Sequence, residues 1–143
     1  MKVLLSIKPE YVRKIFAGTK KYEYRKSIFT KHVDKVVVYA TKPMGMIVGE
    51  FSVEEVLVEE PEILWKETHE VSGISKDFFD QYFEGRQKGY ALKVSSPQLY
   101  DEPIDPFKLF TSFIPPQSFK YIDTETERSE ERRVGKECPT ECR

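Results

Sequence analysis

The spacing of apolar residues changes near the amino end of the chain, and each spacing predicts a different element. Residues 2–7 form a short, mostly apolar run, which is typical of a β-strand. Pro9 suits the first position of a helix, where a missing N–H costs nothing, and Gly18 suits the left-handed residue that ends a helix. Between them, apolar residues recur at helical spacing at Tyr11, Val12, Ile15 and Phe16. We therefore expect a strand followed directly by a short helix.

The pattern from residue 21 to residue 94 predicts four more strands and two amphipathic helices. The strands are expected at residues 21–26, 33–40, 47–58 and 90–94, and the helices at residues 61–71 and 75–84. The third of these strands changes phase at Glu54 and Glu55, which indicates a β-bulge. Prolines from Pro97 onward predict loops around a short helical turn near Phe107.

These elements predict one domain over residues 1–122, with Phe119 and Ile122 making its last ordered contacts. Residues 123–143 have almost no apolar side chains, so we expect a disordered tail. The string RSEERRVGKEC within the tail resembles a translated sequencing adapter, and we assign it no function. A basic arm for nucleic acid is a weaker interpretation, because the positive charges there are mixed with negative ones.

The net charge of −1 conceals a strong asymmetry along the chain. Residues 1–42 contain eleven Lys or Arg and three Asp or Glu, which gives +8. Residues 43–127 contain seven Lys or Arg and seventeen Asp or Glu, which gives −10. A basic segment of this kind favours a polyanionic partner. The alternative is an internal charge dipole, in which acidic helices pair with basic strands.

Several functional classes are disfavoured by composition. Both cysteines, Cys138 and Cys142, lie in the expected tail, so the domain has no thiol for a disulfide, a zinc site or a nucleophile. His69 and Glu70 do not extend to a metalloprotease motif, since Gly73 stands where the second histidine would be. No apolar stretch is long enough to cross a membrane, and no signal peptide is recognisable. We expect a cytoplasmic protein without a metal or other cofactor.

The segment from Gly18 to Arg25 reads GTKKYEYR and fits the pattern G-x-K-x-x-E-x-R at all four fixed positions. Together with the SIKP turn at residues 6–9 and the predicted helix between them, it resembles the ASCH domain family of the PUA-like superfamily. This resemblance implies an α+β fold, with a mixed β-barrel of about five to six strands and flanking helices. It also implies a nucleic-acid partner, since the family is often proposed to bind RNA and is related to readers of modified bases.

The chemistry of the motif can be read from the residue types. In a strand beginning near Lys21, Glu23 and Arg25 share a face, whereas Lys20 must project from the preceding turn as a rim residue. Arg25 offers a planar fork to phosphate or a base edge, and Glu23 can accept from an exocyclic amine. Lys8 adds a charge beside a helix N-terminus that favours anions. The alternative for the motif is a ladder of surface ion pairs.

Three tyrosines are candidates for stacking on a base: Tyr22, Tyr24 and Tyr39. A tyrosine that alternates along a strand usually belongs to the core, and Tyr39 is the best candidate for an exception because its strand ends there. The leading hypothesis is therefore a module that binds RNA or a modified nucleoside or nucleotide. Its expected binding residues are Lys8, Gly18, Lys20, Glu23, Arg25, Tyr39 and Lys42.

The alternative is an enzyme, in which Lys20 and Glu23 are the catalytic candidates. Relatives within the superfamily hydrolyse the amide of acetylated cytidine, and the resemblance implies a role there for a lysine at the position of Lys20. Glu23 occupies the place of the threonine in that pattern, so the hydroxyl is missing. Other family members are described as nucleases, for which Glu23 is a possible general base. A protein-interaction module built on the acidic helices of residues 59–84 also stays open.

Overall fold

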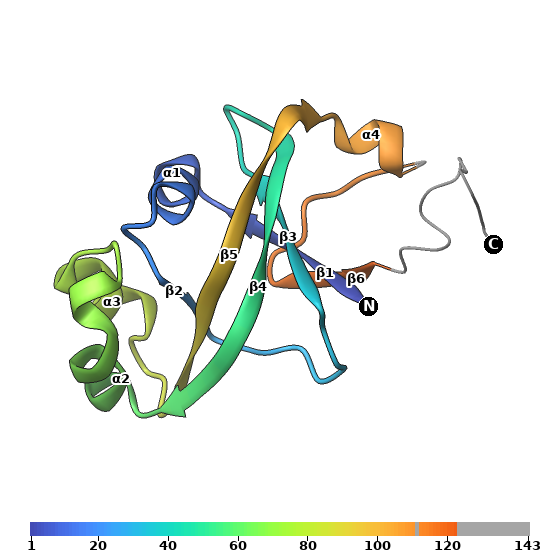
Figure 1. The fold of residues 1–143 in the computed structure, drawn as a ribbon. Coiled ribbons are helices and arrows are strands. Elements are labelled where there is room, and N and C mark those ends of the chain that lie inside the picture. The colour runs from blue at the N-terminus through green and yellow to red at the C-terminus, as the bar shows by residue number, and fades with distance from the viewer. Residues whose placement is uncertain (111, 123–143) are drawn as a thin grey trace.

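The computed structural model of the chain describes residues 1–110 and 112–122, and it contains six strands with helices on one side and at one end (Figure 1). The strands are β1 (Lys2–Ile7), β2 (Tyr22–Arg25), β3 (Lys35–Ala40), β4 (Met46–Glu59), β5 (Gly89–Ile104) and β6 (Phe119–Ile122). The helices are α1 (Pro9–Ala17), α2 (Pro61–Thr68), the 3-10 turn η1 (His69–Val71), α3 (Lys76–Tyr82) and α4 (Pro106–Leu109). The predicted tail at residues 123–143 lies outside the described residues.

The six strands form one mixed sheet in the order β2-β5-β4-β3-β1-β6. β1 and β3 are parallel, and the other neighbouring strands are antiparallel. The α+β class is confirmed. The expected closed barrel is not, because β2 and β6 are the two edges of the sheet and no backbone ladder joins them within the described residues.

The long hairpin of β4 and β5 both confirms and corrects the sequence pattern. The predicted bulge is present, because the pairing moves from Val53 with Val94 directly to Val56 with Leu92. β5, however, continues through Pro97 to Ile104 instead of ending near residue 94. Among residues 1–110 and 112–122, no strand pairs with the far side of β5 beyond Lys93. The register with β4 also shifts around Ser96 and Pro97, so the missing N–H of proline breaks no ladder there.

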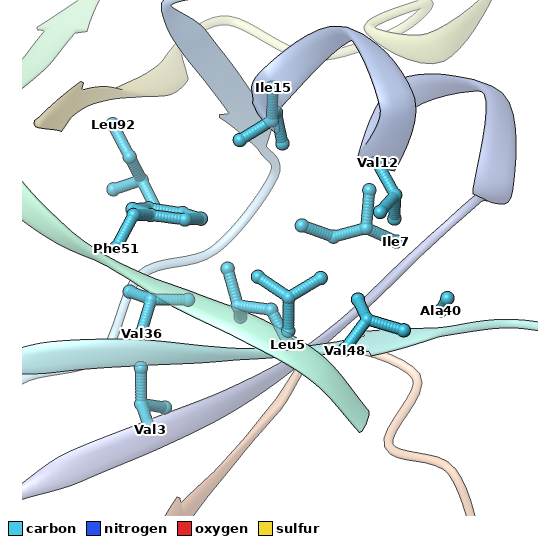
Figure 2. Close-up of a cluster of buried hydrophobic side chains, with 11 residues drawn as sticks. Val3, Leu5, Ile7, Val12, Ile15, Val36, Ala40, Val48, Phe51 and Leu92 are labelled. Atoms are coloured by element: carbon cyan, nitrogen blue, oxygen red, sulfur yellow. The ribbon is translucent and has the colours of Figure 1, made fainter. Parts of the chain in front are cut away.

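Side chains that alternate along the strands contribute to three hydrophobic clusters. The first cluster lies beneath α1, where Val12 and Ile15 pack onto Leu5, Val36 and Phe51 (Figure 2). The second cluster lies on the opposite face and contains Leu4, Val37, Tyr39, Ile47, Phe110, Phe113 and Ile122. The third cluster lies under α2 and α3 and contains Tyr24, Leu64, Phe79, Phe83 and Ala91. The five buried residues of β3, Val36 to Ala40, supply both faces, as predicted.

Helix α1 begins and ends where the sequence predicts. Pro9 occupies its first turn, and Gly18 follows it with a φ of 88°, in the left-handed region that favours glycine. The N–H of Gly18 donates to the carbonyl of Ile15, and the next two N–H groups donate to Lys14. This turn sets the position from which Lys20 leaves the helix. No helix among the described residues is long and apolar enough to cross a membrane.

Candidate functional site

A pocket of about 160 Å³ lies between the end of β1, the start of α1, strand β2 and helix α3. Four of the predicted site residues line it together: Lys8, Lys20, Glu23 and Arg25. The other lining residues are Ser6, Ile7, Tyr11, Tyr24, Ile74, Phe78 and Tyr82. The pocket thus combines four charged side chains with aromatic walls.

Lys20 lies in the wall of this pocket and not at its rim, which corrects the expectation from sequence. Its side chain is only 2% exposed. The Nζ atom donates to the backbone carbonyl of Ser72 at 2.7 Å and lies 3.9 Å from Oε1 of Glu23. It also lies 5.4 Å from the ring centre of Tyr11 and 5.2 Å from that of Tyr24. These contacts partly replace the water that the ammonium group loses on burial.

Burial is the main influence on the pKa of Lys20. Loss of solvent lowers the pKa of the Lys20 ammonium, and the nearby carboxylate of Glu23 opposes this only in part. The charge of Glu23 alone would raise this pKa, so the effect of burial outweighs it. Burial likewise raises the pKa of the hydroxyls of Tyr11, Tyr24 and Tyr82 around the pocket. A buried amine with a lowered pKa is a feature common at functional sites.

Glu23 lies between two positive groups. Its Oε1 atom faces Lys20, and its Oε2 atom accepts from Nη1 of Arg25 at 3.2 Å. The second terminal nitrogen of Arg25, Nη2, donates to the carbonyl of Ser118 at 2.5 Å, and the hydroxyls of Ser27 and Ser118 are 2.9 Å apart. Arg25 is thereby held from two sides, with its guanidinium at the pocket.

The segment from Val71 to Gly73 supports the motif through three successive carbonyl groups. They accept from the backbone N–H of Lys21 at 2.7 Å, from Nζ of Lys20 at 2.7 Å and from Nζ of Lys14 at 2.9 Å. Gly73 has a φ of +73°, and a Cβ atom there would lie 2.7 Å from Cβ of Lys20. Sequence reasoning missed this segment, although Gly73 was visible as the break between two helices.

Aromatic side chains from α1 and α3 form the remaining wall. The rings of Tyr11 and Phe78 are 5.6 Å apart, and those of Phe78 and Tyr82 are 6.3 Å apart and nearly parallel. Nζ of Lys8 lies 5.3 Å from the Phe78 ring, and Nζ of Lys26 lies 4.8 Å from the Tyr82 ring. The sequence pattern predicted an amphipathic helix over residues 75–84 and gave no signal that Phe78 and Tyr82 would line a pocket.

Three predicted site residues do not line the pocket. Tyr39 is 4% exposed and packs against Phe113 in the second cluster, with ring centres 5.0 Å apart. Lys42 is exposed in the turn after β3, and Gly18 acts as the end of α1. A ligand-binding role for these three stays a prediction without a contact to support it. The described residues contain no group of three His, Cys, Asp or Glu side chains arranged for a metal.

Residues 5–100 match the family model of the ASCH domain. The chain belongs to the ASCH domain family. This confirms the resemblance stated on the motif, and it places the fold in the PUA-like superfamily. The pocket lies within the matched range except for the contact that Ser118 makes with Arg25.

Curated relatives include proteins of different size and name. An ASCH domain-containing ribonuclease from Zymomonas mobilis is 27% identical over 129 residues, covering 85% of this chain and 84% of that protein. The large ribosomal subunit protein uL22 of Ureaplasma parvum is 29% identical over 121 residues, covering 84% of this chain. The chain spans only 39% of the length of that second relative.

Solved structures agree with the family assignment. The crystal structure of ASCH from Zymomonas mobilis matches with a TM-score of 0.80 and 26% sequence identity, covering 90% of this chain and 89% of that one. A mutant of the same protein, with a tyrosine changed to phenylalanine, matches with a TM-score of 0.80 and 25% identity, covering 85% of this chain and 90% of that one. The ASCH domain seen here therefore has the arrangement of that solved ASCH protein.

Proposed function

We propose that the pocket around Lys20, Glu23 and Arg25 binds a nucleotide, and that the natural ligand is RNA. The observation that carries the proposal is the position of Glu23. A carboxylate held between an ammonium and a guanidinium, inside a pocket with aromatic walls, offers both acceptors and donors to a flat polar ligand. A nucleobase has this complementary character, since it carries polar groups on its edge and a stacking face.

Each group has a defined part in such a complex. Glu23 accepts from an exocyclic amine of the base, because carboxylate oxygens accept more than one hydrogen bond. Arg25 has further N–H donors beyond the two that it uses on Glu23 and Ser118. Tyr11 and Phe78 offer ring faces or edges to the base. Lys20 adds a buried charge beside the ligand.

Two further observations support RNA as the ligand. The motif and Lys8 lie in the basic segment of residues 1–42, whose charge of +8 attracts a polyanion. The Zymomonas mobilis relative, which covers most of both chains, is named as a ribonuclease. The basic segment and the pocket coincide, so long-range attraction delivers the ligand to the site that recognises it.

Binding of labelled short RNAs and of single nucleotides to an Arg25→Ala variant tests the proposal. We expect affinity to fall about 10- to 100-fold, because a hydrogen bond to a charged group contributes roughly 1.5–3 kcal/mol. Arg13→Ala is the matched control, since Arg13 is exposed on α1 and does not line the pocket. Circular dichroism confirms that both variants fold. Equal affinities of Arg25→Ala and the unmodified protein would exclude the proposal.

Cleavage of RNA at the same pocket is the second candidate, favoured by the lowered pKa of Lys20 and the name of the relative. In this reaction the 2′-hydroxyl oxygen forms a bond to the adjacent phosphorus while the bond from phosphorus to the 5′ oxygen breaks. Lys20 takes the proton of the hydroxyl in the unprotonated form that its lowered pKa favours, and the departing oxygen takes a proton from water. Arg25 stabilises the charge on the phosphate oxygens.

The two candidates separate in one experiment on the purified protein. Lys20→Arg keeps the positive charge but removes the titratable amine, so a cleaving enzyme loses turnover and keeps binding. RNA with 2′-deoxy sugars is bound without cleavage. A binding module shows no product with either protein by mass spectrometry.

A panel of acylated nucleosides in the same assay tests the amidohydrolase that the resemblance implied. Glu50 lies outside the lining of this pocket and accepts from the hydroxyl of Tyr100 at 2.9 Å, so Glu23 is the carboxylate available there.

A further inference from the structure

Lys8 lines the pocket, and Lys26 lies over the ring of Tyr82, which also lines it. Neither lysine has a carboxylate partner in the described part of the chain. Lys8 and Lys26 are both exposed, and each ammonium lies over an aromatic ring. Several other lysines, by contrast, are paired with acidic side chains, namely Lys2, Lys35, Lys76 and Lys93. The charges of Lys8 and Lys26 therefore remain available to an anion.

The two ammonium groups come from two different segments and lie over two rings that line the pocket. Lys8 follows β1 and lies over Phe78, whereas Lys26 follows β2 and lies over Tyr82. The two rings belong to one face of α3, since their residues are four positions apart, and both line the pocket. A ligand seated between these rings and Glu23 thus has one ammonium group near each of the two rings.

The acidic residues of α3 do not compete for these lysines. Asp80 accepts from Lys76 at 2.9 Å and lies on another side of the helix from Phe78 and Tyr82. Helical periodicity also separates Asp77 from Tyr82. The side of the pocket formed by these two rings is therefore cationic and aromatic, while the outward side of the same helix is acidic.

We propose that Lys8 and Lys26 bind the two phosphates that flank a base held in the pocket, so that the ligand is an internal nucleotide of a single strand. This inference rests on the proposed function, and it specifies a ligand class that a free nucleoside does not meet. A single strand is required because a base enters the pocket only when it is unpaired. The ring contacts hold each flexible lysine near the pocket, and a phosphate offers the ammonium a stronger, charge-assisted hydrogen bond.

The test compares two probes that differ in phosphate content. Ribonucleosides carry no phosphate, and trinucleotides without terminal phosphates carry two that flank the middle base. We expect the unmodified protein to bind the trinucleotide at least about tenfold more tightly at low salt. For two contacts on a single strand, the logarithm of the affinity should fall with the logarithm of salt with a slope of about −1.4.

The double variant Lys8→Gln with Lys26→Gln should lose the tenfold gain of the trinucleotide over nucleosides and most of the salt dependence. Lys31→Gln is the matched control, since Nζ of Lys31 also lies over a ring, that of Tyr121 at 5.0 Å, away from the pocket. NMR titration measures the weak nucleoside binding.

The outcomes separate the two proposals. Nucleoside binding with no gain for the trinucleotide overturns the role of the two lysines and leaves the pocket as a nucleoside site. A gain that survives in the double variant overturns it as well. Failure to bind either probe removes the proposed function together with this inference.

Discussion

Tyr24 and Tyr39 occupy similar places in the sequence pattern but opposite environments in the protein. Tyr24 lies beside Lys20 in the pocket, and its hydroxyl is hydrogen-bonded to Oγ1 of Thr68 at 2.5 Å. Tyr39 packs on Phe113 in the second cluster, and its hydroxyl has no hydrogen-bond partner in the part of the chain that the structure describes. Tyr24 thus belongs to a buried polar network, whereas Tyr39 packs within an apolar cluster.

The difference follows from the alternation of side chains along a strand. In β3, Val36 and Val38 belong to the first cluster, whereas Val37 and Tyr39 belong to the second. Whether a residue of a strand reaches the pocket therefore depends on the face of the sheet from which its side chain projects, and not on its position at the end of the strand. The pocket region buries charge and must satisfy it with specific partners, but the second cluster needs only apolar contact.

Gly73→Ala should have the largest effect on the pocket region. Alanine is strained at a φ of +73°, and its Cβ would clash with the stem of Lys20 at 2.7 and 2.8 Å. We expect a loss of about 2–4 kcal/mol in the free energy of unfolding, together with loss of ligand binding. Urea denaturation measures the first effect and titration with RNA the second.

Gly85→Ala is the control for backbone strain alone. Gly85 has a φ of +79°, but nothing lies within 4 Å of a Cβ atom there. It should cost about 1–2 kcal/mol and leave binding intact. Equal losses of unfolding free energy in Gly73→Ala and Gly85→Ala would show that the clash with Lys20 adds nothing to the cost of backbone strain.

Comparison with Lys20→Met should show that the buried lysine makes the stability of the protein depend on pH. The pKa of Lys20 in the folded protein is below 10.5, its usual value. At pH values between the folded and the unfolded pKa, the unfolded chain therefore binds more protons than the folded protein. The stability of the unmodified protein relative to Lys20→Met should therefore rise as the pH increases toward 10.5. Each unit of lowering contributes about 1.4 kcal/mol. Thermal melts of both proteins across this range measure the difference, and a difference independent of pH would contradict the burial argument.

Tyr24→Phe and Tyr39→Phe compare the two regions directly. Because Thr68 donates its own proton to the carbonyl of Leu64 at 2.7 Å, Tyr24 is the donor to Thr68. Losing that hydrogen bond should cost about 1 kcal/mol. Tyr39→Phe should change stability by less than about 0.5 kcal/mol. Chemical denaturation of the two variants measures both changes in the free energy of unfolding. A larger loss of stability in Tyr39→Phe than in Tyr24→Phe would contradict this prediction.

Lys76→Ala should have the smallest effect. Lys76 and Asp80 form an exposed ion pair at 2.9 Å on α3, and such pairs contribute about 0.3–0.5 kcal/mol. The loss should disappear in high salt, because solvent ions screen exposed charges. A salt-independent loss would indicate that the pair contributes through packing.

The elements that depend on local pattern could be predicted from sequence. Helix α1 with Gly18 at its end, the buried strand β3 and the bulge at Glu54 and Glu55 all follow from residues within one element. The grouping of Lys20, Glu23 and Arg25 was also predictable, because the motif places them on one turn and one strand.

Contacts between distant segments could not be predicted in this way. The burial of Lys20 depends on the carbonyl of Ser72, which lies 52 residues away, and the position of Arg25 depends on Ser118, which lies 93 residues away. The extension of β5 through Pro97 depends on the absence of a neighbour on one side. Nothing in the local sequence near the motif encodes any of these contacts.

Arg25 also connects two parts of the sheet, because it is the last residue of β2 and its side chain reaches Ser118, the residue just before β6. β2 and β6 are the two edge strands of the sheet in the described residues. The guanidinium of Arg25 therefore links two edges that no backbone hydrogen bonds connect there. Lysine has a single ammonium and cannot span Glu23 and Ser118 with the same planar geometry. The contact between the two edge strands and the shape of the pocket thus involve the same side chain.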